Sequence, residues 1–348
     1  MAVPAPSLDP ETIPADPNFR TRAAWEEVVG PAHAFLEQVT ARLAEQVDAF
    51  EPEIASYARY ALTNQGKQLR PTLVALAAGT CGPQTDEHVT LAVVIEMIHL
   101  ATLVHDDIMD GASMRRGRST LARHCGPDVA VLVGDCLFAH ALKLAAGFST
   151  PDICRAVALS THVVCTGEIL QTHRRRRWNL GRAEYFKVLE MKTAELFALA
   201  CELGGRLSSG TESERAALRR FGLALGTAYQ IYDDCVDLYG AEDDAGKSLG
   251  TDLAKGKVTL PLLTFFERAG TEDVARMIAW LESWDPASFA GVRALVETVD
   301  ARGESCRVIA GFLDEARKAL DELKETPERH ALVALTAFLE QQTSALGG

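Results

Sequence analysis

The sequence lacks a CxxC motif, a secretion signal and an excess of basic residues. Its eight cysteines include no CxxC motif, which argues against zinc sites and thioredoxin-type redox sites. The net charge of −13 argues against nucleic acid as a partner, because nucleic acids attract basic surfaces. The acidic balance does not exclude an anionic substrate, since bound metal ions can reverse the local sign of charge.

The first residues and the most apolar stretch both bear on where the protein works. Residues 1–20 contain five prolines and no apolar signal-peptide core, so we interpret them as a flexible leader. The stretch at residues 89–104 is interrupted by Glu96 and His99, which makes it an unconvincing membrane span. Both observations fit a protein of the reducing cytoplasm.

Apolar residues recur at three- and four-residue spacing almost throughout the rest of the chain. One such helical stripe consists of Leu91, Val94, Ile95, Ile98 and Thr102. Few runs alternate with a period of two, and no β-hairpin signal stands out. The sequence therefore predicts one all-α domain that covers residues 21–348.

One acidic motif, DDxxD, occurs twice, each time at the end of a periodic helical segment. Its carboxylates are Asp106, Asp107 and Asp110 in HDDIMD, and Asp233, Asp234 and Asp237 in YDDCVD. On a helix the three carboxylates of one motif share a narrow arc, where they repel one another without a counter-ion. Oxygen-only ligands of this kind suit Mg²⁺. A single motif would suit a solvated acidic helix end equally well, but two motifs predict a metal site between two helices.

Basic residues occur around both clusters, where a diphosphate would need them. They are Lys67, Arg70 and His99 before the first cluster, Arg115 and Arg116 just after it, and Lys247 and Lys257 after the second. Taken singly, each suits a surface charge, or a core histidine in the case of His99. Taken together, they predict two anion sites, one bound through metal and one bound directly by Arg, Lys and His.

In order and spacing, the motifs from residue 67 to residue 261 resemble those of the trans-isoprenyl diphosphate synthases, also called the polyprenyl synthetase family. The resemblance rests on GKQLRP, IHLATLVHDDIMD, SMRRGRST, GDCLFAHAL, GEILQ, KTAELF, YQIYDDCVD and GKSLGTDLAKGKVTLP. GKQLRP differs from the family's commoner GGKRLRP but keeps Lys67 and Arg70, and SMRRGRST lacks the usual proline. The resemblance implies a large helical bundle of the isoprenoid synthase type with a central active-site cavity, a homodimer, and three Mg²⁺ ions with substrate bound.

The resemblance also implies a reaction, the head-to-tail condensation of isopentenyl diphosphate with geranyl, farnesyl or geranylgeranyl diphosphate. The expected direct Mg²⁺ ligands are Asp106, Asp110 and Asp233, with Asp107, Asp234 and Asp237 acting through water. The allylic diphosphate would contact Arg115, Lys192, Lys247 and Lys257, and isopentenyl diphosphate would contact Lys67, Arg70, His99 and Arg116. The expected catalytic residues are Lys192, Thr193 and Gln230. The last two would aim oxygen dipoles at a carbocation, although both also suit ordinary helix packing.

The helical segment that precedes the first cluster is expected to line the channel for the growing isoprenoid chain. Its four expected channel residues are Val94, Ile98, Ala101 and Thr102. Ala101 and Thr102 are small, and synthases that stop early often place bulky aromatics near these positions. Val94 lies 12 residues before Asp106, about 18 Å along a helix, which leaves depth for several isoprene units. We predict a hexaprenyl to octaprenyl product, with geranylgeranyl as the alternative.

The basic run HRRRRW, residues 173–178, has two interpretations. It is a solvated loop, as charge runs usually are, or it makes a transient contact with an anionic membrane surface through its arginines and Trp178. Two rival functions also stay open, a class I terpene cyclase and a non-catalytic subunit of a heteromeric synthase. Lys67, Arg70 and His99 favour elongation over cyclisation, because a cyclase has no need for a second diphosphate site. Every expected motif position is filled, which disfavours a non-catalytic subunit.

Overall fold

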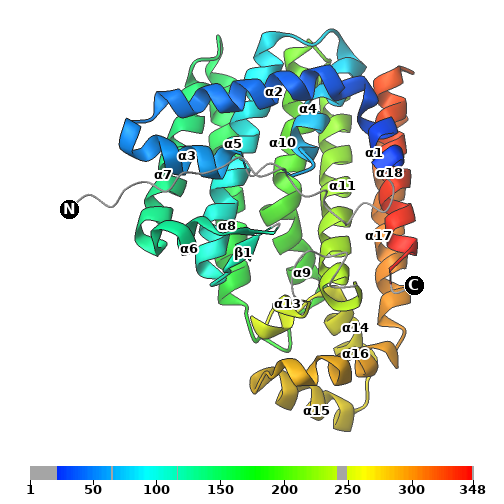
Figure 1. Cartoon of the computed structure of the whole chain (residues 1–348). Helices are drawn as coiled ribbons and strands as arrows, with labels where there is room; N and C mark the ends of the chain where they lie inside the picture. The colour runs from blue at the N-terminus through cyan, green and yellow to red at the C-terminus, as the bar shows by residue number, and fades with distance from the viewer. Residues whose placement is uncertain (1–21, 64–65, 116, 241–248, 347–348) are drawn as a thin grey trace, which may run out of the picture.

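The computed structural model describes residues 22–63, 66–115, 117–240 and 249–346, and within them the chain is almost entirely helical (Figure 1). In these ranges the only strands are β1 (Met114–Arg115) and β2 (Arg118–Ser119), which pair antiparallel. The predicted all-α fold class is confirmed. The predicted leader at residues 1–20 lies outside the described residues.

Long helices lie side by side and form the body of the molecule, and α2 lies across their upper end in Figure 1. The long helices are α4 (Leu69–Cys81), α5 (Asp86–Met109), α7 (Pro127–Ala146), α8 (Pro151–His173), α10 (Glu195–Leu207), α11 (Glu212–Tyr239), α17 (Ala301–Leu320) and α18 (Pro327–Ser344). The other helices are α1 (Arg22–Val29), α2 (His33–Glu45), α3 (Pro52–Leu62), α6 (Leu121–Cys125), α9 (Arg182–Leu189), α13 (Thr251–Ala254), α14 (Leu260–Arg268), α15 (Thr271–Glu282) and α16 (Phe289–Glu297). Their apolar faces bury one hydrophobic core.

Threonine caps fix the starts of α5 and α11, the two helices that carry the aspartate clusters. The backbone N–H of Thr85 donates to Nδ1 of His88 at 3.0 Å. Before α11, the N–H of Thr211 donates to the Glu214 carboxylate at 2.8 Å, and the Thr211 hydroxyl accepts from the N–H of Glu214 at 3.2 Å. Such reciprocal caps satisfy N–H groups that a helix start otherwise leaves unpaired. The helices that begin there run for 24 and 28 residues, and their far ends carry the aspartates.

Two glycines of α11 allow it to approach the residues at the start of α10. A Cβ atom on Gly222 would lie 2.6 Å from the carbonyl oxygen of Phe197, and one on Gly226 would lie 2.6 Å from Cα of Ala194. A larger residue would force the two helices apart, because the atoms it would meet belong to backbone. The close approach places the segment just before α10 against the middle of α11.

Three helices are long and apolar enough to span a membrane by length and composition alone, namely α5, α7 and α8. They differ in burial: 72% of the most apolar segment of α5 is buried, but only 39% of that of α7 and 28% of that of α8. Helix α5 is thus a core helix. The other two expose large apolar side chains, among them Leu132, Leu159 and Ile169, each more than 60% accessible (62%, 61% and 68%).

Candidate active site

The two aspartate clusters lie toward the same end of the bundle. The first occupies the end of α5, with Asp110 as the C-terminal cap residue, and the second occupies the last turns of α11. The elements that follow these helices, β1 and α13, both lie in the lower half of the view in Figure 1. The segment after α13 connects the clusters, because Lys255 reaches Asp110 at 2.8 Å while Lys257 lines a pocket together with Asp234.

Cations pair with the first two aspartates of the first cluster. The Nε and Nη2 atoms of Arg115 both lie 2.7 Å from Oδ1 of Asp107. The Nζ atom of Lys192 lies 3.5 Å from Oδ2 of Asp106. Carboxylates at the C-terminal end of a helix are unfavourable, because the helix dipole is negative there. The arginine and the lysine offset this repulsion.

Two cations from different segments hold Asp110, the third aspartate of the cluster. Its Oδ1 atom lies 3.0 Å from Nη2 of Arg175, and its Oδ2 atom lies 2.8 Å from Nζ of Lys255. Burial alone would raise the pKa of Asp110, but the hydrogen bond and charge of Lys255, together with the charges of Lys257 and Lys192, lower it. At Asp106, burial raises the pKa and Lys192 offsets only part of the rise. The first cluster therefore depends on nearby positive charge to stay ionised.

In the second cluster, Asp234 is buried and has neutral hydrogen-bond donors. It accepts a hydrogen bond from the hydroxyl of Tyr185 at 2.7 Å and one from the amide of Gln230 at 3.0 Å. Burial, assisted by the charge of Asp252, raises the pKa of Asp234 to about 7. Two aspartates of one sequence pattern thus have pKa values shifted in opposite directions, Asp110 downward and Asp234 upward.

Asp237 ties the end of α11 to the start of α13. Its carboxylate accepts from the backbone N–H groups of Thr251 and Asp252, at 3.2 and 2.9 Å, and from the Thr251 hydroxyl at 2.7 Å. Asp252 in turn accepts from Nζ of Lys257 at 2.8 Å. Asp237 is 2% exposed, whereas Asp233 is half-buried. Within the second cluster, Asp237 therefore holds two elements together, and the Asp233 side chain is the more accessible of the two.

A π-helical turn, Glu190–Ala194, contacts both clusters. Its Lys192 contacts Glu168 and Asp106, and its Thr193 hydroxyl donates to the side-chain oxygen of Gln230 at 2.7 Å. Because Gln230 donates to Asp234, the same turn reaches the second cluster. Such π-helical turns occur frequently at functional sites. The structure thus brings the three predicted catalytic residues, Lys192, Thr193 and Gln230, together between the clusters.

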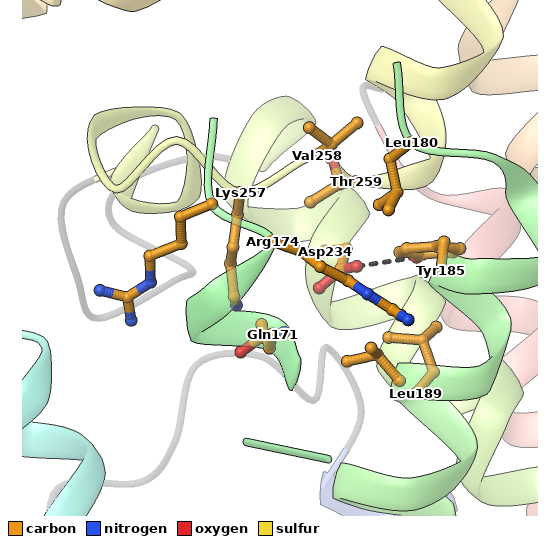
Figure 2. Close-up of a pocket in the computed structure, with 11 residues that line it drawn as sticks. Gln171, Arg174, Leu180, Tyr185, Leu189, Asp234, Lys257, Val258 and Thr259 are labelled. Carbon is orange, nitrogen blue, oxygen red and sulfur yellow. Dashed lines mark hydrogen bonds between the residues drawn. The ribbon is translucent and has the colours of Figure 1, made fainter. Parts of the chain in front are cut away.

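A small pocket, partly open to solvent, lies beside Asp234 (Figure 2). Arg174, Arg175 and Lys257 supply three cations to its wall. Figure 2 shows Arg174, Lys257 and Asp234 around this space, with the Tyr185 hydroxyl bonded to the Asp234 carboxylate. The remaining wall is largely apolar, and it includes Leu180, Val188, Leu189 and Val258.

Lys67, Arg70 and His99, three of the residues predicted for isopentenyl diphosphate, are half-buried. The guanidinium carbon of Arg70 lies 4.9 Å from the ring centroid of Phe197. Lys67 lines a second pocket that Phe197 and Tyr229 also line. Lys67 and Arg70 thus share a neighbour on α10. The other predicted contacts, Arg116 and Lys247, lie outside the described residues.

Three of the four predicted channel residues are completely buried. Val94, Ile98 and Ala101 are each 0% exposed, so no water-sized probe reaches them in this structure. Thr102 is half-buried, and its hydroxyl donates to the carbonyl oxygen of His99 at 2.6 Å. An accessible channel along this face of α5 stays a prediction.

The arginine run is not the solvated loop that its composition favours. Arg174 is half-buried and donates to the carbonyl oxygen of Glu184 at 2.9 Å, and Arg175 pairs with Asp110. Trp178 is half-buried and packs against Phe266, with ring centroids 6.3 Å apart. The solvated-loop interpretation is wrong for these three residues, because they have partners on the protein. Arg176 and Arg177 are exposed, and a membrane contact through them stays a prediction.

Three residues of the site were not predicted from the sequence: Arg175, Tyr185 and Lys255. Lys255 lies in GKSLGTDLAKGKVTLP, only two residues from Lys257, so the motif itself could have suggested it. Arg175 is one of four consecutive arginines, and the sequence does not show which of them reaches the site. Tyr185 is one tyrosine in an amphipathic segment, and nothing in the local sequence marks its contact with Asp234.

The donors at the first cluster suit a hard divalent cation. Among the residues that the structure describes, no three His, Cys, Asp or Glu side chains lie close enough to hold an ion by themselves. Mg²⁺ does not require such a cage, because it usually binds through one or two carboxylates together with water and substrate phosphates. Asp106 and Asp110 offer carboxylates of this kind on one helix end, so the residues fit a magnesium–diphosphate complex.

Comparison with known proteins shows which family the chain resembles in sequence and in structure. Residues 51–299 match the family model described as polyprenyl synthetase. The chain is 33% identical to octaprenyl diphosphate synthase from Escherichia coli over 311 residues, which covers 87% of this chain and 94% of that protein. It is 38% identical to nonaprenyl diphosphate synthase from Mycobacterium tuberculosis over 278 residues, which covers 78% of this chain and 82% of that protein. A polyprenyl synthase from Caulobacter crescentus, solved with calcium and isoprenyl diphosphate, superimposes with a TM-score of 0.86 at 34% identity and covers 91% of this chain and 97% of the solved chain.

Proposed function

The chain belongs to the polyprenyl synthetase family and is a prenyltransferase, and we propose that it synthesises all-trans polyprenyl diphosphates of medium to long chain. Its proposed substrates are isopentenyl diphosphate and an allylic diphosphate primer. The observation that carries the proposal is the convergence of two carboxylate clusters and the lysines between them on one end of the bundle. Carboxylates hold metal there, and the lysines supply charge to a diphosphate.

The proposed first step is ionisation of the allylic carbon–oxygen bond. Asp106, Asp110 and Asp233 would hold Mg²⁺, with three ions in the site when substrate is bound. The charge of the metal would neutralise the departing diphosphate. Lys192 and Lys257 add fixed positive charge, since each lies within hydrogen-bonding distance of side chains that line the site. The leaving group takes the bonding electron pair, and the allylic fragment becomes a delocalised cation.

In the proposed mechanism, Thr193 and Gln230 stabilise that cation. The Thr193 hydroxyl donates a hydrogen bond to the Gln230 oxygen, which leaves the lone pairs of the hydroxyl oxygen available to a positive charge. Gln230 is itself held by its hydrogen bond to Asp234. These two consecutive hydrogen bonds orient oxygen dipoles before the cation forms. In the proposed second step, the double bond of isopentenyl diphosphate attacks the cation, and a proton passes to the released diphosphate.

Isopentenyl diphosphate would be held without metal by Lys67, Arg70 and His99, with Arg116 as a further contact. The half-buried positions of the first three support this assignment, because a partly desolvated cation binds a phosphate more strongly than a fully exposed one. A terpene cyclase would have no use for them.

The proposed product is a hexaprenyl to octaprenyl diphosphate, with geranylgeranyl diphosphate as the shorter alternative. Relatives with octaprenyl and nonaprenyl products support a long chain. The small side chain of Ala101 supports it as well, since synthases that stop early often place bulky aromatics near this position. Each added unit buries five carbons, about 4 kcal/mol, so release of a long product into water would be slow. A transient membrane contact of Arg176 and Arg177 would accelerate that release.

We also propose a homodimer located in the cytoplasm. Helices α7 and α8 support the dimer, because they are apolar and yet mostly unburied, and a second copy of the chain would cover them. All eight cysteines are free thiols, which suits a reducing compartment. Light scattering after gel filtration should give twice the 37.6 kDa of one chain, and Leu132→Glu should lower that mass. A wild-type mass of one chain would refute the dimer.

Incubation of the purified protein with Mg²⁺, labelled isopentenyl diphosphate and farnesyl diphosphate tests the proposed reaction. Chromatography should resolve a ladder of products that ends beyond geranylgeranyl diphosphate, and EDTA should abolish it. Loss of farnesyl diphosphate to a hydrocarbon, without incorporation of label, would reassign the protein as a cyclase. Ala101→Phe should end the ladder earlier and Ala101→Val should have an intermediate effect. An unchanged ladder in both variants would exclude a tail that passes Ala101.

A further inference from the structure

Arg175 lies at the boundary between the first aspartate cluster and the pocket of Figure 2. Its Nη2 atom pairs with Oδ1 of Asp110 at 3.0 Å, and its side chain also lines the pocket. Its Nε atom is buried and has no hydrogen-bond partner. A buried guanidinium donor without a partner is costly, so this atom has capacity for a ligand. Arg175 thus makes one bond to the cluster and retains a donor for something else.

The loop that carries Arg175 is fixed to the segment that carries Lys255. The backbone N–H of Arg176, a residue with φ of 60°, donates to the carbonyl oxygen of Gly256 at 2.7 Å. Gly256 has φ of 68°, and a Cβ there would lie 2.5 Å from Cγ of Arg176. Only glycine permits this close docking. Both cations on Asp110 therefore come from segments that contact each other.

Each oxygen of Asp110 has a cation, so a metal ion must compete for this carboxylate. Mg²⁺ binds carboxylate oxygens at about 2.0–2.1 Å, and its charge would repel a guanidinium held 3.0 Å from the same oxygen. Displacement of Arg175 would cost little if the guanidinium gained another anion at the same moment. A diphosphate is such an anion, because the planar fork of arginine matches phosphate oxygens. The geometry suits an exchange of partners.

We infer that Arg175 is a displaceable counter-ion, which neutralises Asp110 before metal arrives and turns to the diphosphate when the metal–diphosphate complex takes Asp110. This inference rests on the proposed function for the identity of the anion. It assigns a positioning and binding role to a residue of the arginine run. It also makes metal binding and diphosphate binding depend on each other. Metal takes Asp110 away from Arg175, and the diphosphate then pairs with the arginine that the metal has left without its carboxylate.

The test compares Arg175→Gln with Arg177→Gln, a matched change in the same loop at an exposed arginine that lies 3.8 Å from the Glu184 carboxylate. Binding of Mn²⁺ without any diphosphate, followed by electron paramagnetic resonance, should tighten about three- to tenfold in R175Q, because a competing cation is gone. Binding of inorganic pyrophosphate at saturating Mg²⁺, followed by calorimetry, should weaken about tenfold. R177Q should match the wild type in both measurements.

Effects of opposite sign distinguish the inference from a loss of structure, which would weaken both ligands. Wild-type affinities in R175Q, or weaker Mn²⁺ binding, would overturn it. Should R175Q fail to fold, Arg175→Lys decides: the retained charge keeps Mn²⁺ affinity near that of the wild type, and loss of the planar fork weakens pyrophosphate. Equal pyrophosphate affinity in R175K and wild type would then refute the inference. Neither measurement needs turnover, so a protein that shows these effects without elongating farnesyl diphosphate would refute the proposed function alone.

Discussion

The two aspartate clusters share one sequence pattern but differ in almost every physical respect. The first lies at the end of α5, and arginine and lysine side chains pair with all three of its carboxylates. In the second, Asp234 and Asp237 are buried within α11 and accept hydrogen bonds from a tyrosine, an amide, a hydroxyl and backbone N–H groups. Salt-bridge cations can be exchanged for metal, whereas buried neutral donors hold a fixed geometry. The difference suggests a first cluster built for exchange and a second built for support.

Asparagine at the first cluster should give the largest loss of activity. Asp106→Asn and Asp110→Asn keep the shape of each side chain but remove the negative charge that holds metal against the diphosphate. We expect the elongation rate at saturating Mg²⁺ to fall about 10³-fold, with little change in stability. Steady-state incorporation of labelled isopentenyl diphosphate measures the rate, and urea unfolding in EDTA measures stability. Near-wild-type rates in both variants would remove the first cluster from the site.

Alanine at Asp237 should reverse that pattern and damage stability more than any change in the first cluster. The substitution strands the Thr251 and Asp252 N–H groups and the Thr251 hydroxyl, all of which now donate to Asp237. We expect the free energy of unfolding in urea to fall by about 2 kcal/mol, because buried donors would lose their acceptor. Unchanged stability combined with a large loss of rate would show that Asp237 acts in the chemistry, and would break the comparison.

The raised pKa of Asp234 predicts a pH effect on stability. Burial raises its pKa from 3.8 to about 7 in the folded protein. Between these values the folded state keeps a proton that the unfolded state has lost, so stability falls as pH rises through the window and is constant above it. Asp234→Asn removes the titrating group. In EDTA, the unfolding free energy of wild type relative to D234N should therefore decrease from pH 5 to pH 8. A difference that is constant with pH would contradict the raised pKa.

The same comparison separates what the sequence predicts from what it does not. Helical periodicity predicted the fold class, because the burial pattern of a helix is written in neighbouring residues. The repeated motif predicted which carboxylates gather, since spacing within one helix fixes their common face. Arg175 and Tyr185 were missed because they lie 65 and 49 residues from the aspartates they contact. Those partners depend on how separate helices pack, and no local pattern records it. The sequence pattern also could not distinguish the clusters, since burial and partners come only from the packed structure.

The smallest expected effect is that of Tyr185→Phe, which removes one neutral hydrogen bond from Asp234 and the hydroxyl's contact with the backbone of Leu260. We expect a loss of about 1 kcal/mol in the free energy of unfolding and only a few-fold loss in rate, because Gln230 still holds the carboxylate. Tyr60→Phe is the matched control, since it removes a tyrosine hydroxyl that donates to a backbone carbonyl oxygen, that of Ser119, and not to an aspartate. If both variants lose similar stability and only Y185F loses rate, Tyr185 contributes through the position of Asp234. If Y185F loses as much rate as D106N, the second cluster is as close to the chemistry as the first, and the division between exchange and support fails.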